Sequence, residues 1–237
     1  MIQEQLERTS LLLGEEHLQR VQKAHLLVVG LGGVGGMTIE MLARAGVNRF
    51  TLVDGDRTSL SNTNRQLLAF RDNVGELKTE EAQKRILRIN PEAQVTLFSH
   101  FINEGDVPSL LSSSSFDFVL DCIDTVAPKV ALLSECYTRK IPLISSMGAG
   151  AKLDPSRVKI ADISKTNYCS LARVVRRKLK LQGIKKGIPV VYSSEEPIRK
   201  AVLTGSLERG KNTTVGTISY LPNLFGCFMA AYVLNRL

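Results

Sequence analysis

The 237-residue sequence predicts a single α/β domain with a mostly parallel sheet, a mixed or antiparallel carboxy-terminal extension and a closing helix. Three observations support this prediction. Short apolar runs alternate with amphipathic stretches, as β-α-β units require. A glycine-rich turn follows the first apolar run, and the alternation changes beyond residue 150.

The parallel part is predicted from five apolar runs separated by helical patterns. The predicted strands are 25–29, 49–53, 94–99, 116–121 and 142–146. The predicted helices are 34–45, 76–89, 106–111 and 127–139. Further along, we expect strands at 157–163, 190–193 and 213–219, a basic helix at 171–181 and a closing helix at 221–234. The glycine- and lysine-rich stretch 182–212 is predicted to contain a mobile loop or insertion.

Composition indicates an ordinary globular protein, with 43% hydrophobic and 23% charged residues. The formal charge of +8 is uneven, because residues 157–211 hold 14 Lys or Arg against 4 Asp or Glu, a local balance of +10. Such asymmetry predicts a polyanionic partner for the carboxy-terminal third.

The chain ends and the cysteines indicate where the protein is located and whether it forms disulfides. The acidic amino terminus lacks the pattern of a secretory signal, so we expect a cytoplasmic protein. Residues 221–237 are apolar but too short to span a membrane, which predicts a buried or dimer-interface helix and no stable membrane insertion. The four cysteines form no Cys-x-x-Cys pair and are expected to be free thiols.

A glycine turn closes the first predicted strand. Gly30, Gly32, Gly33 and Gly35 stand in a segment that runs directly into a helix, whose amino terminus presents unpaired N–H groups to phosphate. Asp54 ends the second strand, where a carboxylate can bind ribose hydroxyls. This combination predicts a nucleotide site on a Rossmann-like sheet and fits NAD as well as ATP.

Residues after the second strand favour ATP over NAD. Asp56, Asn62, Arg65 and Gln66 follow Asp54 closely, and Lys78 comes twelve residues after Gln66. A triphosphate carries more charge than a dinucleotide pyrophosphate and needs cations at separate points. Asp56 is equally well explained as the cap of a turn.

These motifs resemble those of the ThiF/MoeB superfamily, which is related to ubiquitin-activating enzymes. The resemblance rests on Gly-x-Gly-Gly-x-Gly, Asp-x-Asp, Ser-Asn-x-x-Arg-Gln, Gly-x-x-Lys and, at 121–124, Asp-Cys-x-Asp. It implies that the glycines, Asp54, Asp56 and Gln66 belong to an ATP site, with Asp54 on the ribose. It also implies that Asn62, Arg65 and Lys78 contact phosphates and that Asp124 coordinates Mg²⁺. Arg8 matches an amino-terminal arginine that reaches into the other subunit's site, which implies a homodimer.

Within this superfamily, segments 63–66, 72–75, 145–155 and 163–166 and the basic helix look like the tRNA threonylcarbamoyladenosine dehydratase branch. That resemblance implies ATP-dependent dehydration of a tRNA nucleoside by adenylation of its carboxylate, in one ThiF-type domain. Residues 1–150 would be the nucleotide-binding half and 151–237 the basic substrate-binding half. The expected contacts with the anticodon arm are Arg173, Arg176, Arg177, Lys178, Lys180, Lys185 and Lys186. Tyr168 and Tyr192 are the nearby aromatic residues that could stack on bases.

Two other functions stay open at this point. One is an adenylyltransferase that activates the carboxy terminus of a ubiquitin-like sulfur-carrier protein, although the missing Cys-x-x-Cys pairs count against it. The other is a non-enzymatic module that keeps a dinucleotide. A sulfur-transfer or cysteine desulfurase partner and a nucleophilic role for Cys169 are also left open.

Overall fold

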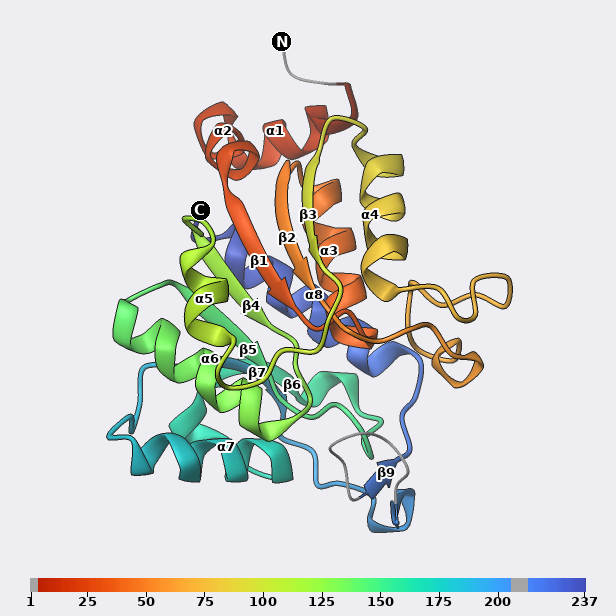
Figure 1. Cartoon of the computed structure of the whole chain (residues 1–237), viewed down its shortest axis with the longest axis vertical. Coiled ribbons are helices and arrows are strands. Elements are labelled where there is room, and N and C mark those ends of the chain that lie inside the picture. The colour runs from red at the N-terminus through yellow and green to blue at the C-terminus, as the bar shows by residue number, and fades with distance from the viewer. Residues whose placement is uncertain (1–3, 206–212) are drawn as a thin grey trace.

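A seven-stranded sheet forms the centre of the molecule (Figure 1), and the computed structural model describes residues 4–205 and 213–237. The strand order is β3-β2-β1-β4-β5-β7-β6. The strands are β1 (His25–Val29), β2 (Arg49–Val53), β3 (Gln94–Phe98), β4 (Phe118–Asp121), β5 (Leu143–Ser146), β6 (Val158–Asp162) and β7 (Pro189–Ser193). Neighbouring strands are parallel except β6, which runs antiparallel to β7. The predicted fold class is confirmed.

Helices cover both faces of this sheet. They are α1 (Glu7–Leu13), α2 (Glu15–Lys23), α3 (Gly33–Arg44), α4 (Lys78–Ile89), α5 (Val107–Ser112), α6 (Val126–Arg139), α7 (Ser170–Leu181) and α8 (Tyr220–Leu234). Helices α3, α4 and α8 pack on one face and α5, α6 and α7 on the other. Successive side chains of β1 point to opposite faces, so Leu26 and Val28 join the first hydrophobic cluster while Leu27 and Val29 join the second. Because β1 is covered on both faces, all of its side chains are buried, which explains its continuous apolar sequence.

The connections that follow β1 and β4 lead to opposite sides of the sheet order. From β1 the chain passes through α3 to β2, whereas β4 on the other side leads through α6 to β5. In open α/β sheets, ligands bind in the crevice at the carboxyl ends of strands where the order reverses. By this rule we expect a ligand beyond the ends of β1 and β4, and we refer to that region as the crevice.

The carboxy-terminal part extends the same sheet and then crosses back over it. Strands β6 and β7 follow β5, and α8 returns to pack on α3, where a Cβ at Gly226 would lie 2.6 Å from the carbonyl oxygen of Val34. Helix α8 buries much of its surface, as predicted. In residues 4–205 and 213–237, no helix has the length and apolar character needed to cross a bilayer.

Several expected boundaries were wrong. Only Thr213–Val215 of the predicted 213–219 strand is strand, β9, and it pairs with β8 (Val202–Thr204), which was not predicted. Helices α1 and α2 were also missed. The predicted loop 182–212 is partly ordered by β7 and β8, and its residues 206–212 lie outside the described residues.

Candidate nucleotide site

The glycine turn after β1 is shaped by two close backbone contacts. Gly30 has a φ of +92°, and a Cβ there would lie 2.8 Å from the carbonyl oxygen of Cys122. A Cβ on Gly35 would come within 1.8 Å of the Gly30 oxygen, so neither position accepts a side chain. Helix α3 begins immediately, and its N-cap Gly32 supplies no side-chain hydrogen bond to the first turn. The first N–H groups of α3 are therefore suited to bind an anion.

Asp54 ties the end of β2 to this turn. Its Oδ2 accepts a hydrogen bond from the Leu31 N–H at 2.6 Å and its Oδ1 accepts one from the Asp56 N–H at 2.8 Å. Burial raises the pKa of Asp54, while the Lys78 ammonium and the two N–H groups act in the opposite direction. The carboxylate thus holds the turn in the shape that exposes the start of α3.

Lys78 is brought to the same place by a folded-back loop. The Thr58 N–H donates to the Glu76 carbonyl and the Gly75 N–H donates to the Thr58 carbonyl, so the loop returns to the end of β2. Lys78 then opens α4 with a buried side chain whose ammonium forms an ion pair with the half-exposed carboxylate of Asp56. Lys78, which is distant in sequence from Asp54, therefore lies close to it in the fold.

The segment that contains Asn62, Arg65 and Gln66 lies against the glycine turn. A Cβ on Gly33 would lie 3.3 Å from the carbonyl oxygen of Arg65. A Cβ on Gly32 would lie 3.8 Å from the side-chain nitrogen of Gln66. Asn62 is buried and closes a capping box with Ser59, so its side chain shapes the turn.

Two side chains of this segment bear on ligand binding. The Arg65 guanidinium donates to the carbonyl oxygen of Ser61 at 3.0 Å and to Asn64 Oδ1 at 2.8 Å. The buried Gln66 side-chain oxygen has no hydrogen-bond partner among the described residues. A buried polar atom without a partner at the glycine turn is the kind of group that a bound nucleotide satisfies.

The loop after β4 completes the crevice. A Cβ on Gly30 would lie 3.2 Å from the Ile123 nitrogen, so this loop runs directly alongside the glycine turn, and the exposed Asp124 follows one residue later. Beneath the loop, Asp121 accepts hydrogen bonds from Lys129 and from the Ser145 hydroxyl, both at 2.5 Å. These three side chains are fully buried. Lys129 and Ser145 were not among the predicted site residues, although the available signal was a polar residue inside a predicted helix and inside a predicted strand.

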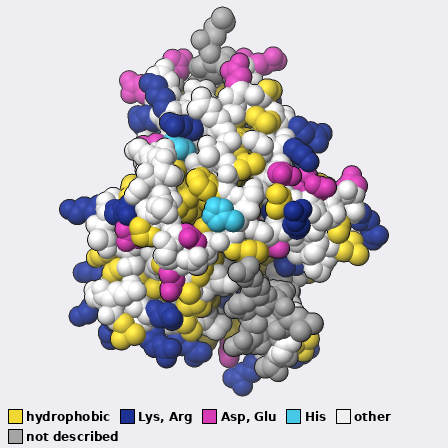
Figure 2. All heavy atoms as spheres, in the orientation of Figure 1, with side chains coloured by type: hydrophobic (Ala, Val, Ile, Leu, Met, Phe, Trp, Pro, Cys, Tyr) yellow, Lys and Arg dark blue, Asp and Glu magenta, His cyan; other side chains and the backbone are white. Residues whose placement is uncertain are grey.

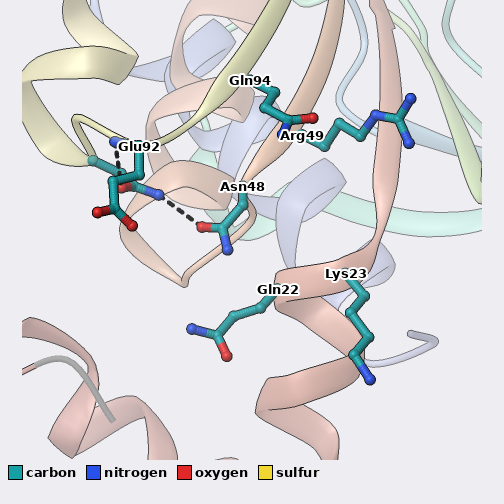
Figure 3. Close-up of a pocket in the computed structure, with 7 residues that line it drawn as sticks. Gln22, Lys23, Asn48, Arg49, Glu92 and Gln94 are labelled. Atoms are coloured by element: carbon teal, nitrogen blue, oxygen red, sulfur yellow. Dashed lines mark hydrogen bonds between the residues drawn. The ribbon is translucent and has the colours of Figure 1, made fainter. Parts of the chain in front are cut away.

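The predicted cations do not all lie at this crevice. Arg8 is exposed on α1, and Leu6 just before α1 contacts Gly46, which precedes β2. Helix α1 therefore lies at the amino-terminal edge of the sheet, opposite the glycine turn (Figure 1). A hollow of about 290 Å³ opens at this edge, lined by Gln22, Lys23, Asn48, Arg49, Asn90, Glu92 and Gln94 (Figure 3). Of its lining residues, Asn90 donates a hydrogen bond to the Asn48 side-chain oxygen at 2.7 Å, and the hollow has none of the nucleotide-site motifs.

The basic residues predicted to bind RNA lie on α7 and the turn after it. Figure 2 shows Lys and Arg side chains gathered along the edge of the molecule that α7 forms. Arg173, Arg177, Lys178, Lys180, Lys185 and Lys186 are exposed. Arg176 instead is half-buried and donates to the Thr166 carbonyl at 2.9 Å and to the Thr166 hydroxyl at 2.5 Å. Tyr192 is buried in β7 and unable to stack on a base, whereas Tyr168 is 55% exposed.

The cysteines are free thiols, as predicted. Burial raises the pKa of both Cys122 and Cys136 to about 12, so neither supplies a thiolate at neutral pH. Cys169 caps α7, where its sulfur accepts the Ala172 N–H at 3.4 Å. Of the described residues, no three His, Cys, Asp or Glu side chains gather as a metal cluster.

The sheet, the glycine turn and the charged crevice together define a nucleotide-binding α/β protein of Rossmann-like architecture. Residues 3–237 match the model of the ThiF family. The chain belongs to the ThiF family.

Individual relatives are similar over different lengths. The Bacillus subtilis tRNA threonylcarbamoyladenosine dehydratase is 40% identical over 240 residues, which cover 98% of this chain and 94% of the relative. A crystal structure of the Escherichia coli tRNA N6-threonylcarbamoyladenosine dehydratase in complex with ATP has a TM-score of 0.87 and 35% identity, covering 98% of this chain and 93% of that one. The Salmonella typhimurium molybdopterin-synthase adenylyltransferase is 40% identical over 139 residues, covering 59% of this chain and 54% of the relative.

Proposed function

We propose that this chain is an ATP-dependent tRNA threonylcarbamoyladenosine dehydratase, which cyclises the modified nucleoside by adenylating its carboxylate. The observation that carries this proposal is similarity over nearly the whole of both chains to relatives of that name. Similarity to a molybdopterin-synthase adenylyltransferase covers only 59% of the chain. The greater share of the chain covered by the dehydratases therefore favours their activity over that of the adenylyltransferase.

The chemistry requires activation because a carboxylate would have to expel oxide. In the first step, a carboxylate oxygen of the nucleoside attacks the α-phosphorus of ATP and pyrophosphate leaves. The ureido group of the same nucleoside then attacks the acyl carbon, its N–H proton is lost, and AMP departs with the former carboxylate oxygen. The nucleoside loses the elements of water as ATP becomes AMP and pyrophosphate. Tethered attack needs no protein nucleophile, because the reacting groups are already held together.

The crevice residues fit the ATP part of this scheme. In this scheme the start of α3 donates N–H groups to phosphate, the Asp54 carboxylate binds the ribose, and the Gln66 oxygen gains a partner in the nucleotide. Lys78 and Arg65 neutralise the β- and γ-phosphates once they exchange their present contacts, with Asp56 and with Ser61, for the anion.

Magnesium is proposed as the companion of ATP. Mg²⁺ is usually held by one or two carboxylates together with substrate phosphates, so the exposed Asp124, in the loop beside the glycine turn, fits this requirement. An ion held there would supply positive charge to neutralise the phosphates.

The remaining proposals concern partners and location. Residues 1–150 bind nucleotide, and the basic half, 151–237, binds the anticodon arm through phosphate contacts. The enzyme acts as a cytoplasmic homodimer, with Arg8 completing the partner's site. A cysteine desulfurase or another sulfur-transfer protein is a proposed accessory partner.

The proposal is tested by mass spectrometry of anticodon-loop nucleosides after incubation of threonylcarbamoyl-modified tRNA with the protein, ATP and Mg²⁺. We expect the nucleoside to lose one water, and no loss when ATP is omitted. ATP–pyrophosphate exchange stimulated by a sulfur-carrier protein and not by tRNA would replace this proposal with the carrier-activating function. Tight NADH binding without ATP binding would exclude both.

A further inference from the structure

A cavity of about 360 Å³ opens between the start of α7 and the turn before β8. It lies outside the nucleotide crevice. Its lining includes one aromatic residue and three arginines, Tyr168, Arg173, Arg176 and Arg199, against one acid, Glu196. A volume of this size is at the lower end of small-molecule sites, which suits a single nucleotide.

Tyr168 is held in an unusual conformation at the mouth of this cavity. Its φ is +48°, a left-handed value that a bulky side chain adopts at a cost, and the residue is 55% exposed. Such strain persists where the surrounding structure imposes it, often at ligand sites. An exposed ring fixed in this way gives a flat surface on which a base can stack.

The segment before Tyr168 is fixed by Arg176. This side chain donates to the Thr166 hydroxyl and carbonyl and, at 3.4 Å, to the Ile163 carbonyl, so it ties α7 to the turn that ends in Tyr168. Arg176 therefore positions the aromatic ring, and it leaves Arg173 and Arg199 as the exposed cations of the cavity. The Arg199 side chain is 93% exposed, and its contact with Glu196 is long at 3.9 Å.

The cavity adjoins the edge of the sheet that carries the nucleotide site. Cys169, which lines it, has its sulfur 3.6 Å from where a Cβ on Gly148 would be, and Gly148 lies in the turn after β5. Strand β5 pairs with β4, whose following loop carries Asp124. A nucleoside in the cavity is therefore one strand away from the crevice, so a side arm on its base can extend toward ATP.

We propose that this cavity binds the substrate adenosine itself, extruded from the anticodon loop, with its base stacked on Tyr168 and an adjacent phosphate paired with Arg173 and Arg199. This inference rests on the proposed function. It assigns nucleoside recognition to the mouth of the cavity and leaves the other exposed cations of α7 to hold the RNA backbone. Extrusion is the general solution for enzymes that act on a base within structured nucleic acid.

The test compares Tyr168→Asn with Tyr168→Phe. Asn tolerates positive φ, so it relieves the backbone strain while it removes the ring. We expect Tyr168→Asn to lower kcat/KM for modified tRNA by about 10- to 100-fold, to leave the KM for ATP within about twofold and to raise the Tm by a few degrees. Tyr168→Phe keeps the stacking surface and should retain activity close to that of the wild type.

Controls separate this inference from the proposed function. Tyr137→Ala, at a tyrosine 44% exposed on α6, should leave tRNA kinetics unchanged. Affinities for modified and unmodified anticodon stem-loops are measured without ATP, and Tyr168→Asn should reduce the difference between them. Equal discrimination by Tyr168→Asn and wild type, or equal damage by Phe and Asn, would overturn the cavity assignment. Failure of the wild type to remove water from tRNA would reject the proposed function, whereas the stem-loop comparison would still report on the cavity.

Discussion

The two aspartates of the 121–124 motif perform different tasks, although the sequence makes them look equivalent. Asp121 is fully buried and neutralised by Lys129 at 2.5 Å, so its negative charge is already compensated within the protein. It also accepts the Ile123 N–H at 3.1 Å, which fixes the loop above it. Asp124 lies on the exposed side of that loop. The first residue is therefore a support for the loop and the second is the candidate metal ligand.

We predict that Asp124→Ala abolishes Mg²⁺-dependent turnover and leaves the fold intact, because an exposed loop carboxylate contributes little to packing. Circular dichroism and thermal unfolding should match the wild type, while single-turnover dehydration across a Mg²⁺ titration should be lost. Glu92→Ala is the matched control, since Glu92 is an exposed acid at the opposite edge of the sheet. Wild-type activity in Asp124→Ala would show that the metal assignment is misplaced.

Helix α3 carries the phosphate-binding turn at one end and is anchored to its neighbours along its length. Glu40, buried in α3, pairs with Arg85 of α4 at 2.5 Å and with Arg44 at 2.7 Å. Burial alone would raise the pKa of Glu40, but Arg85 and Arg44 outweigh it and the pKa is lowered. On the other side, α8 packs on α3 at Gly226, with no room for a side chain.

We predict that Arg85→Met lowers the free energy of unfolding by about 1–3 kcal/mol at pH 7, because it leaves a buried carboxylate with only one cation. A lowered carboxylate pKa contributes stability above the unfolded-state value and loses it as the pH falls through the folded-state value. The difference between variant and wild type should therefore shrink below the ordinary glutamate pKa of 4.5. Urea unfolding across this pH range measures the effect.

A surface pair provides the comparison for that measurement. Lys84 is 63% exposed and pairs with Glu81 on the same helix. Because an exposed ion pair contributes little, Lys84→Met should leave the free energy of unfolding unchanged within the error of the measurement at all of these pH values. An Arg85→Met effect that is no larger than this, or that persists unchanged in acid, would argue against the ion pair as the anchor of α3 and α4.

Central elements could be predicted from sequence and peripheral ones could not, for a physical reason. Strands β1 and β2 are buried on both faces. The sequence therefore shows each of them as a mainly apolar run, which ends at Gly30 and at Asp54. At the periphery, β9 is a strand only over the three residues that pair with β8. The local sequence of β9 does not indicate which segment it pairs with, so its limits could not be predicted. Helix α2, although missed, carried a usable signal in Leu18 and Val21, which are buried at helical spacing.

The candidate site divides in the same way. The nucleotide residues could be placed together from sequence because the carboxyl ends of adjacent parallel strands meet at one edge. The burial of Arg176 and Tyr192 could not be predicted. Arg176 is half-buried because it binds Thr166 in the 163–166 turn, and Tyr192 lies in β7, which pairs with β6, a strand distant in sequence. Tyr168 gains its significance from a backbone angle that no sequence pattern reports.

On the scale of the whole molecule, the position of Arg8 constrains how the enzyme can work. Helix α1 lies at the amino-terminal edge of the sheet, and the glycine turn, Lys78 and Asp124 lie at the carboxyl edge (Figure 1). The neighbouring Leu11 and Leu12 are 87% and 85% exposed, which leaves an apolar surface on α1 for a partner to cover. Arg8 can therefore serve a nucleotide site only when α1 of one protomer meets the crevice of another.

This geometry predicts complementation between two inactive variants. Arg8→Ala and Lys78→Ala should each be inactive alone, but a 1:1 mixture that exchanges subunits should recover about a quarter of wild-type activity, because half of the dimers are mixed and each mixed dimer holds one intact site. The measurement is tRNA dehydration after co-refolding, with differently tagged subunits to count mixed dimers. Lys78→Ala mixed with Asp124→Ala is the control. Both residues belong to the same chain's crevice, so every site in that mixture stays damaged, and recovery there, or none with Arg8→Ala, would contradict a site shared between protomers.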